Sequence, residues 1–90
     1  MRVGLVGVGR MGAVLATRLA GQVELCLFDR DREKLQITAN KLKCVAVTSL
    51  EEAAAVGIVI LAVPDREVID CIKAFNQMPQ PLIVINIATN

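Results

Sequence analysis

Three glycines near the start of the chain have the spacing that lets a backbone hold a diphosphate. Residues 3–12 read VGLVGVGRMG, an apolar run that ends in Gly7-x-Gly9-x-x-Gly12. In this pattern the first glycine permits a tight turn out of a strand, the second leaves room for phosphates, and the third lets a helix pack close to the strand. The free N–H groups of the first helical turn, at the positive end of the helix dipole, then hold the negative charge. A glycine-rich turn that binds nothing is the alternative, but it leaves no reason for all three glycines.

A carboxylate follows at the distance that dinucleotide binding requires. Asp29 ends a second apolar run, about 20 residues after the glycines. A carboxylate at this place accepts hydrogen bonds from the adenosine ribose hydroxyls and repels a 2′-phosphate, which favours NAD over NADP. Its alternative role is that of a turn or helix-capping residue. Arg30 lies where NADP-dependent enzymes place a guanidinium for the 2′-phosphate, or else over the adenine. We therefore expect NAD as the cofactor, with NADP left open.

Other candidate contacts belong to the glycine loop and to the ends of two later apolar runs. The backbone N–H of Arg10 faces the expected pyrophosphate, and its side chain either adds positive charge or is solvated. Met11 is of a type that more often packs than touches a ligand. Ala62, Val63 and Pro64 are small or rigid residues that leave room for the nicotinamide-side ribose, although an ordinary strand end has similar residues. Thr89 or Asn90 either touches the nicotinamide end or is a turn residue.

No complete set of catalytic groups is found in the chain. It contains no histidine and no tyrosine, and no pair of carboxylates converges on the expected cleft. The lysines all fall on the expected outer faces of helices. The catalytic residues therefore stay unassigned, and no metal site is indicated.

Short apolar runs that alternate with helical periods are expected to position these residues. The predicted strands are residues 2–6, 23–28, 44–47, 57–63 and 82–87. The predicted helices are residues 10–20, 32–43 and 66–76, and a short alanine-rich helix that runs from a Thr48-Ser49 capping box to about Val56. Right-handed crossovers then give an α/β, Rossmann-type parallel sheet in the order 3-2-1-4-5, with helices on both faces. Segments 7–12, 62–65 and 87–90 converge at its switch point.

The helical periods also predict which side chains face the core. The predicted inward residues of the three longer helices are Met11, Val14, Leu15 and Leu19; Leu35, Ile37 or Ala39, and Leu42; and Val68, Ile69, Ile72 and Phe75. Asp31 is the expected N-cap of the second helix, and Gly21 is the expected stop of the first.

Composition restricts the classes of function. Ninety residues form one small domain, and 54% of them are hydrophobic, which is ample for a core. A net charge of +1 with dispersed basic residues predicts no nucleic-acid or anionic membrane partner. No segment has the length of a membrane span, and the apolar start lacks the features of a signal peptide. The three cysteines at positions 26, 44 and 71 are expected to be small buried hydrophobes in a reducing compartment, the cytoplasm.

The chain resembles the β-hydroxyacid dehydrogenase group, which includes 3-hydroxyisobutyrate and 6-phosphogluconate dehydrogenases, with pyrroline-5-carboxylate reductase and prephenate dehydrogenase as relatives. The loop GVGRMG at residues 7–12 is similar to the G-x-G-x-M-G loop of that group. TSLEEA at residues 48–53, VILAVP at 59–64 and VINIAT at 84–89 are similar to three further segments.

The resemblance covers essentially all of the chain, but only the cofactor-binding half of such enzymes. It implies a cofactor site at Gly7, Gly9, Arg10, Met11, Gly12, Asp29, Ala62 and Val63. It also implies that the catalytic group comes from a following helical domain, which is absent from residues 1–90. Members that use NADP commonly have Asn-Arg where this chain has Asp29-Arg30, which weakens the prediction of NADP.

These observations predict that residues 1–90 are the NAD(P)-binding domain of an oxidoreductase of the β-hydroxyacid dehydrogenase or pyrroline-5-carboxylate reductase type. The domain would hold the cofactor for hydride transfer and would be inactive in isolation. The alternative is a non-catalytic nucleotide-sensing module, although such modules usually have Gly-Asp where this chain has Thr48-Ser49. Strand 82–87 is expected to be an apolar sheet edge, covered by self-association or by a following segment of a longer chain.

Overall fold

The computed structural model, which describes residues 1–80 and 82–87, has the predicted α/β architecture. Five parallel strands form one sheet in the order β3-β2-β1-β4-β5. The strands are β1 (Arg2–Val6), β2 (Glu24–Phe28), β3 (Val45–Ala46), β4 (Ile58–Leu61) and β5 (Ile83–Asn86). The helices are α1 (Arg10–Leu19), α2 (Arg32–Leu42), α3 (Leu50–Ala54) and α4 (Asp65–Phe75). The predicted ends of these elements differ from the observed ends by at most two residues.

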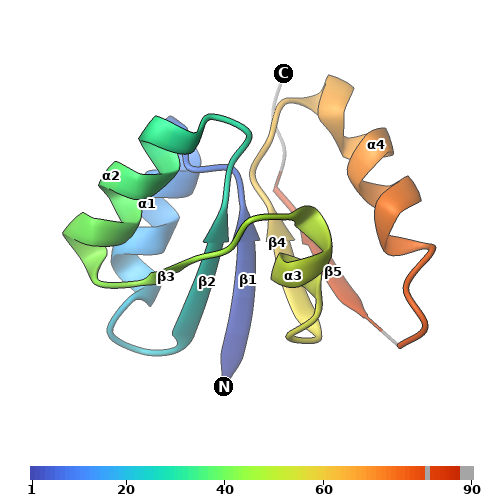
Figure 1. Cartoon of the computed structure of the whole chain (residues 1–90), viewed down its shortest axis with the longest axis horizontal. Helices are drawn as coiled ribbons and strands as arrows, with labels where there is room; N and C mark the ends of the chain where they lie inside the picture. Colours follow the sequence, from blue (N-terminus) through green and yellow to red (C-terminus); the bar gives the residue numbers. More distant parts are fainter. Residues whose placement is uncertain (81, 88–90) are drawn as a thin grey trace.

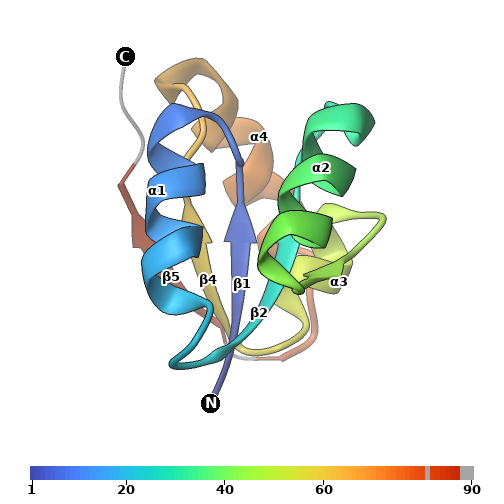
Figure 2. The ribbon, with the colours of Figure 1, turned by 90° about the vertical axis from the view of Figure 1, so that its left-hand side faces the viewer.

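The helices cover the sheet on two sides, as the crossovers require. Helices α1 and α2 lie on one face, and α3 and α4 lie on the other (Figure 1). Figure 2 shows α1 and α2 in front of the strands and α4 behind them. No helix of the described residues is long and apolar enough to cross a membrane.

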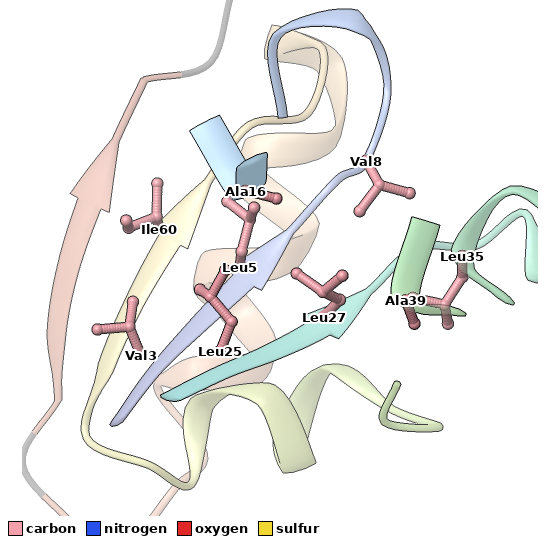
Figure 3. Close-up of a cluster of buried hydrophobic side chains, with 9 residues drawn as sticks. All are labelled: Val3, Leu5, Val8, Ala16, Leu25, Leu27, Leu35, Ala39 and Ile60. Carbon is pink, nitrogen blue, oxygen red and sulfur yellow. The ribbon is translucent and has the colours of Figure 1, made fainter. Parts of the chain in front are cut away.

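Each face of the sheet has its own hydrophobic cluster. Leu5 of β1 and Leu27 of β2 are in register and lie fully buried under α1 and α2, as Figure 3 shows. Val59 and Leu61 of β4 are fully buried on the α3 and α4 side, together with Phe75. Burial on both faces explains why the central strands are apolar apart from Arg2 and Glu24, the exposed first residues of β1 and β2.

Helix α3 lies directly against β1 because of a glycine that the sequence patterns did not single out. A Cβ added at Gly4 would collide with the backbone carbonyl of Ala53, and Ala53 itself is fully buried. The space between the strand and the helix therefore has no room for any side chain at position 4.

Two helices begin at side-chain caps that the sequence predicts. Asp31 accepts a hydrogen bond from the N–H of Lys34 at 3.0 Å, which confirms it as the N-cap of α2. Ser49 caps α3 by accepting from the N–H of Glu52 at 3.2 Å. The carboxylate of Glu52 accepts in return from the N–H and the hydroxyl of Thr48, one residue earlier than in a standard capping box. These bonds from Thr48 lower the pKa of Glu52.

Helix α1 ends just before Gly21, as predicted, but without a left-handed cap. Helix α1 ends at Leu19, its C-cap Ala20 is right-handed, and Gly21 has no positive φ. The chain leaves the helix through a turn in which the N–H groups of Gln22 and Val23 both donate to the carbonyl of Leu19, so no left-handed residue is needed. The left-handed cap occurs at the end of α2 instead, where Lys43 has φ 57°.

Four large apolar residues that the helical periods predict to face the core are exposed, although Ile37 was predicted only as the alternative to Ala39, which is buried. They are Met11, Val14, Ile37 and Ile69, with exposed fractions of 47%, 55%, 60% and 63%. In α1 the buried positions are Gly12 and Ala16, because a helix this close to the sheet meets it with its smallest residues. Leu15 and Leu19 are partly buried beside them, as predicted. The buried residues of α2 are Leu35 and Ala39, and those of α4 are Cys71 and Phe75. The burial of Leu35, Ala39 and Phe75 is as predicted.

Strand β5 is a bare edge of the sheet. Ile83 and Ile85 are exposed by 61% and 45%, while Val84 packs against the α4 side. Their register partners on β4, Ile58 and Ile60, belong to the cluster under α1. The two exposed isoleucines therefore face the α1 side, and no helix of the described residues covers them.

The cysteines at positions 26, 44 and 71 are free, and two of them are buried.

Candidate functional site

The glycine loop joins β1 to α1 at the carboxyl end of the sheet. Gly7 has φ +102°, and its N–H donates to the carbonyl of Phe28 at 2.8 Å. A Cβ at Gly7 would collide with the carbonyl of Ala62, and a Cβ at Gly12 would collide with the carbonyl of Gly7. The turn expected at Gly7 and the close helix packing expected at Gly12 are therefore both present.

Gly9 is different, because the fold does not require it. A Cβ at this position meets no heavy atom within 4 Å, and its φ of −69° and ψ of −161° suit any residue. The sequence argument that only a ligand explains all three glycines is thus corrected: packing explains Gly7 and Gly12, and Gly9 alone borders open space. The residues fit a bound diphosphate at this point, because the missing Cβ leaves a hollow over the backbone.

The helix that begins after Gly9 has bare N–H groups. Its N-cap carries no side-chain hydrogen bond and its first turn carries no acidic residue, whereas α2 and α3 are capped by Asp31 and Ser49. Within residues 1–80 and 82–87, no acceptor meets the N–H groups of Arg10, Met11 or Gly12. Helix α4 also lacks a side-chain cap, but Asp65 and Glu67 place negative charge in its first turn. The start of α1 is therefore the helix start best suited to an anion.

Asp29 ties the end of β2 to the glycine loop. Its Oδ2 accepts a hydrogen bond from the N–H of Val8 at 2.8 Å, and its Oδ1 accepts from the N–H of Asp31 at 2.8 Å. The turn role that the sequence left open is thus present. A carboxylate has about four acceptor sites, so both oxygens retain capacity for ribose hydroxyls. Binding of the ribose by Asp29 stays a prediction.

Arg30 is engaged with the opposite wall of the crevice. Its Nη1 lies 3.1 Å from Oε1 of Glu67, which stands in the first turn of α4. The exposed fractions of the two side chains are 77% and 21%, so the guanidinium is largely solvated while the carboxylate is mostly covered. The two residues are 37 positions apart in the sequence, and the sheet order brings them together.

Two cavities flank the glycine loop. The larger, of about 570 Å³, lies between the end of β2 and the start of α4, and the smaller, of about 510 Å³, lies against α1. Gly9, Ala62, Val63 and Pro64 border both cavities. The predicted site residues Gly7, Asp29 and Arg30 line the larger cavity, and Arg10 and Met11 line the smaller. Gly12 borders neither, because it is buried beneath the loop. Figure 1 shows the β1–α1 and β4–α4 connections at the same end of the sheet.

Met11 is not only exposed but also lines a cavity, in contrast to the packing role predicted for it. It was expected to pack, but its side chain lines the smaller cavity beside Val14. Met11 and Val14 thus belong to the apolar wall of this cavity, whereas Leu15 and Leu19 of the same helix pack against the core. Thr89 and Asn90, the candidates for the nicotinamide end, lie outside the described residues.

Sequence patterns missed several residues that line the larger cavity. They are Val6, Phe28, Asp31, Lys34, Leu50, Glu67, Asp70 and Cys71. A signal for Glu67 existed, because the first turn of a helix that follows a central strand always lies at this edge of a doubly wound sheet. Burial and the carboxylates of Glu67 and Asp70 raise the pKa of the Cys71 thiol, while Arg30 acts in the opposite direction. The raised pKa disfavours the thiolate, which is the nucleophilic form of the group.

The charges around the larger cavity are mainly negative. Its described lining holds four carboxylates, at positions 29, 31, 67 and 70, against two cations, Arg30 and Lys34. Among the described residues, no group of histidine, cysteine, aspartate and glutamate side chains is arranged to hold a metal ion.

Comparison with known families gives one match over nearly the whole chain. The family described as "NADP oxidoreductase coenzyme F420-dependent" matches residues 2–90. A search of curated proteins gives no significant match.

The chain resembles part of several larger proteins of known structure. UDP-N-acetylglucosamine 3-dehydrogenase GnnA from Acidithiobacillus ferrooxidans is 29% identical over 86% of this chain and 25% of its own, with a TM-score of 0.77. Prephenate dehydrogenase from A. aeolicus, solved with hydroxyphenyl propionate and NAD+, is 21% identical over 98% of this chain and 33% of its own, with a TM-score of 0.81. A variant imine reductase from Myxococcus stipitatus, solved with NAD+, is 21% identical over 77% of this chain and 24% of its own, with a TM-score of 0.68. The chain thus spans about a quarter to a third of the length of these proteins.

Proposed function

This chain belongs to the family of coenzyme F420-dependent NADP oxidoreductases and is an NAD(P)-binding Rossmann domain, and we propose that it holds NAD in preference to NADP for hydride transfer. The observation that carries the proposal is Gly9, a glycine that packing does not need, placed before a helix whose first N–H groups are bare. When bound, the nicotinamide ring supplies the hydride chemistry. The residues described above bind and orient it.

The pyrophosphate is assigned to the hollow over Gly9. The N–H groups of Arg10 and Met11 donate to its oxygens, and the exposed Arg10 side chain adds positive charge. Because Gly9 borders both cavities, a diphosphate at this point connects the two halves of a dinucleotide. The adenosine half then occupies the larger cavity beside Asp29. The nicotinamide half occupies the smaller cavity, whose described walls include the apolar side chains of Met11, Val14 and Val63.

The preference for NAD follows from charge. A 2′-phosphate would enter a cavity that has more carboxylates than cations. One of these carboxylates is Asp29, at the position expected for the ribose. A ribose hydroxyl instead meets an acceptor there. The family description names NADP. Our proposal of NAD therefore rests on the residues of this chain and departs from the family description.

Within the family, we assign the chain to oxidoreductases of the β-hydroxyacid dehydrogenase or pyrroline-5-carboxylate reductase type. The support is the GVGRMG loop and the VILAVP strand end, which place Met11 and Pro64 on the smaller cavity. In that group the substrate pocket and the catalytic residue come from a following helical domain. We therefore propose that the substrate is bound and the reaction completed by residues outside positions 1–90.

A direct titration tests the proposal. Purified protein is titrated with NADH and with NADPH, and nicotinamide fluorescence reports binding. We expect saturable binding of both nucleotides, tighter for NADH, because Asp29 accepts from ribose hydroxyls and repels the 2′-phosphate. Equal or tighter binding of NADPH would refute the preference. No binding of either nucleotide would refute the site itself.

A further inference from the structure

The contact between Arg30 and Glu67 crosses the larger cavity. One residue comes from the end of β2 and the other from the first turn of α4, and both line the cavity beside Asp29. Their charged atoms are 3.1 Å apart. Arg30 would otherwise be the natural partner of a 2′-phosphate, because a guanidinium pairs strongly with phosphate oxygens.

We propose that Glu67 is a cofactor-selectivity residue, which holds the Arg30 guanidinium by a salt bridge and so denies it to a 2′-phosphate. The inference rests on the proposed function, and it adds a second determinant to Asp29. Asp29 acts by meeting the ribose directly. Glu67 acts through Arg30 and is therefore a positioning residue.

Burial makes the two partners unequal. Glu67 is only 21% exposed, so it has little freedom to leave the pair, whereas Arg30 is 77% exposed and is held at its charged end. For NADP to use Arg30, the salt bridge must break and a mostly covered carboxylate must stay unpaired beside a phosphate dianion. For NAD, the salt bridge remains intact, and its carboxylate has no phosphate beside it.

The test is the ratio of the NADPH and NADH dissociation constants, measured by fluorescence titration at low salt. Glu67→Gln keeps the shape of the side chain and removes the charge that holds Arg30. An exposed ion pair contributes up to about 1 kcal/mol, so its release is expected to tighten NADPH binding about five-fold. NADH binding is expected to change less than about two-fold, since its ribose carries no phosphate. Added salt should reduce the gain for NADPH.

Two further variants separate this mechanism from a general loss of negative charge. In the Arg30→Gln background, Glu67→Gln is expected to have a smaller effect on the ratio, because no guanidinium remains to be released and only the direct repulsion between the carboxylate and the phosphate is removed. Glu33→Gln makes the same chemical change at an exposed position of α2 that is outside the described cavity lining and takes no part in the salt bridge. It is expected to leave the ratio within about two-fold of the original.

Arg30→Gln alone gives an independent check. Because Arg30 is already engaged, its loss is expected to change NADPH affinity less than about two-fold. A ten-fold loss would show that Arg30 binds the 2′-phosphate in the original protein, and it would overturn the inference.

The inference is also overturned if Glu67→Gln leaves the ratio unchanged while its circular dichroism spectrum shows a native fold. The same gain with and without Arg30 would likewise contradict it. Failure of the original protein to bind either nucleotide would instead remove the proposed function, and this inference with it.

Discussion

Replacement of Gly9 by valine separates binding from folding. The valine Cβ would meet no atom of the protein within 4 Å, and the backbone angles at Gly9 are accessible to any residue. The loss in unfolding free energy is therefore expected to be about 1 kcal/mol or less, the usual scale of a change at a helix N-cap. For a domain of this size, that corresponds to a fall in melting temperature of less than about 8 °C.

The same substitution is expected to prevent binding of the cofactor. The valine methyl groups fill the hollow in which the pyrophosphate must approach the N–H groups of Arg10 and Met11. Loss of two hydrogen bonds to a charged group, at about 1.5 kcal/mol each, weakens binding by about 3 kcal/mol, more than 100-fold in Kd. The assay is fluorescence titration with NADH, together with thermal unfolding followed by circular dichroism.

Gly21→Val is the matched control. A Cβ at Gly21 also meets nothing within 4 Å, and this glycine lies beyond the other end of α1. We expect Gly21→Val to bind NADH with unchanged affinity. Unchanged affinity in folded Gly9→Val would refute the placement of the diphosphate. An equal loss in both variants would show that the position of the added side chain is immaterial.

Four shorter predictions concern stability, reactivity and association. Gly12→Ala should lower the melting temperature by more than about 10 °C in a thermal scan, since the added methyl collides with a backbone carbonyl; a native-like melting curve would contradict the packing. Ser49→Ala should cost about 1 kcal/mol in a urea titration because α3 loses its cap, whereas an unchanged midpoint would mean that the cap is without effect. Burial raises the pKa of the Cys71 thiol, so at about pH 8 it should react more slowly with a thiol reagent in native than in urea-unfolded protein. The rate in the native protein should increase as the pH rises. Equal rates in native and unfolded protein would disprove the protection of Cys71. Light scattering should detect self-association that Ile85→Lys abolishes, because Ile83 and Ile85 are exposed on the edge strand; a monomer at high concentration would exclude it.

The order of the sheet could be predicted from the sequence because few alternatives satisfy the pattern. Five apolar runs separated by helical periods must form right-handed crossovers, and the glycine loop marks the first strand. The observed order, with β1 at the centre, follows from those rules. Capping by Asp31 and Ser49 could also be predicted, because a cap depends only on residues within one turn.

Helix faces were harder to predict because residue size is a poor guide to contact with a sheet. In α1 the large residues Met11 and Val14 are exposed, and the helix touches the sheet through Gly12 and Ala16. A count of large apolar residues therefore places Leu15 and Leu19 correctly but assigns Met11 and Val14 to the core, where they do not lie. Local spacing does not reveal how closely two elements pack, which is what decides between large and small residues.

The backbone positions of the candidate site could be predicted from the sequence, but some of its side-chain contacts could not. Loop glycines and strand ends have fixed places in this fold, so Gly9 and Asp29 could be located from their spacing. The contact between Arg30 and Glu67 joins positions 37 residues apart, and no local pattern encodes it. The sequence showed an arginine beside the ribose position, but its engagement depends on a helix from the other half of the sheet.

Asp29 restricts how this protein can be redesigned for another cofactor. Its two oxygens accept from the N–H groups of Val8 and Asp31, so the residue anchors the glycine loop in addition to the ribose-binding role that we propose for it. An asparagine has only one acceptor oxygen, and its amide nitrogen would place a donor against one of those donors. A single exchange intended to admit NADPH would thus loosen the loop that every nicotinamide dinucleotide needs. Engineers would have to supply a substitute anchor for Val8 before altering the carboxylate.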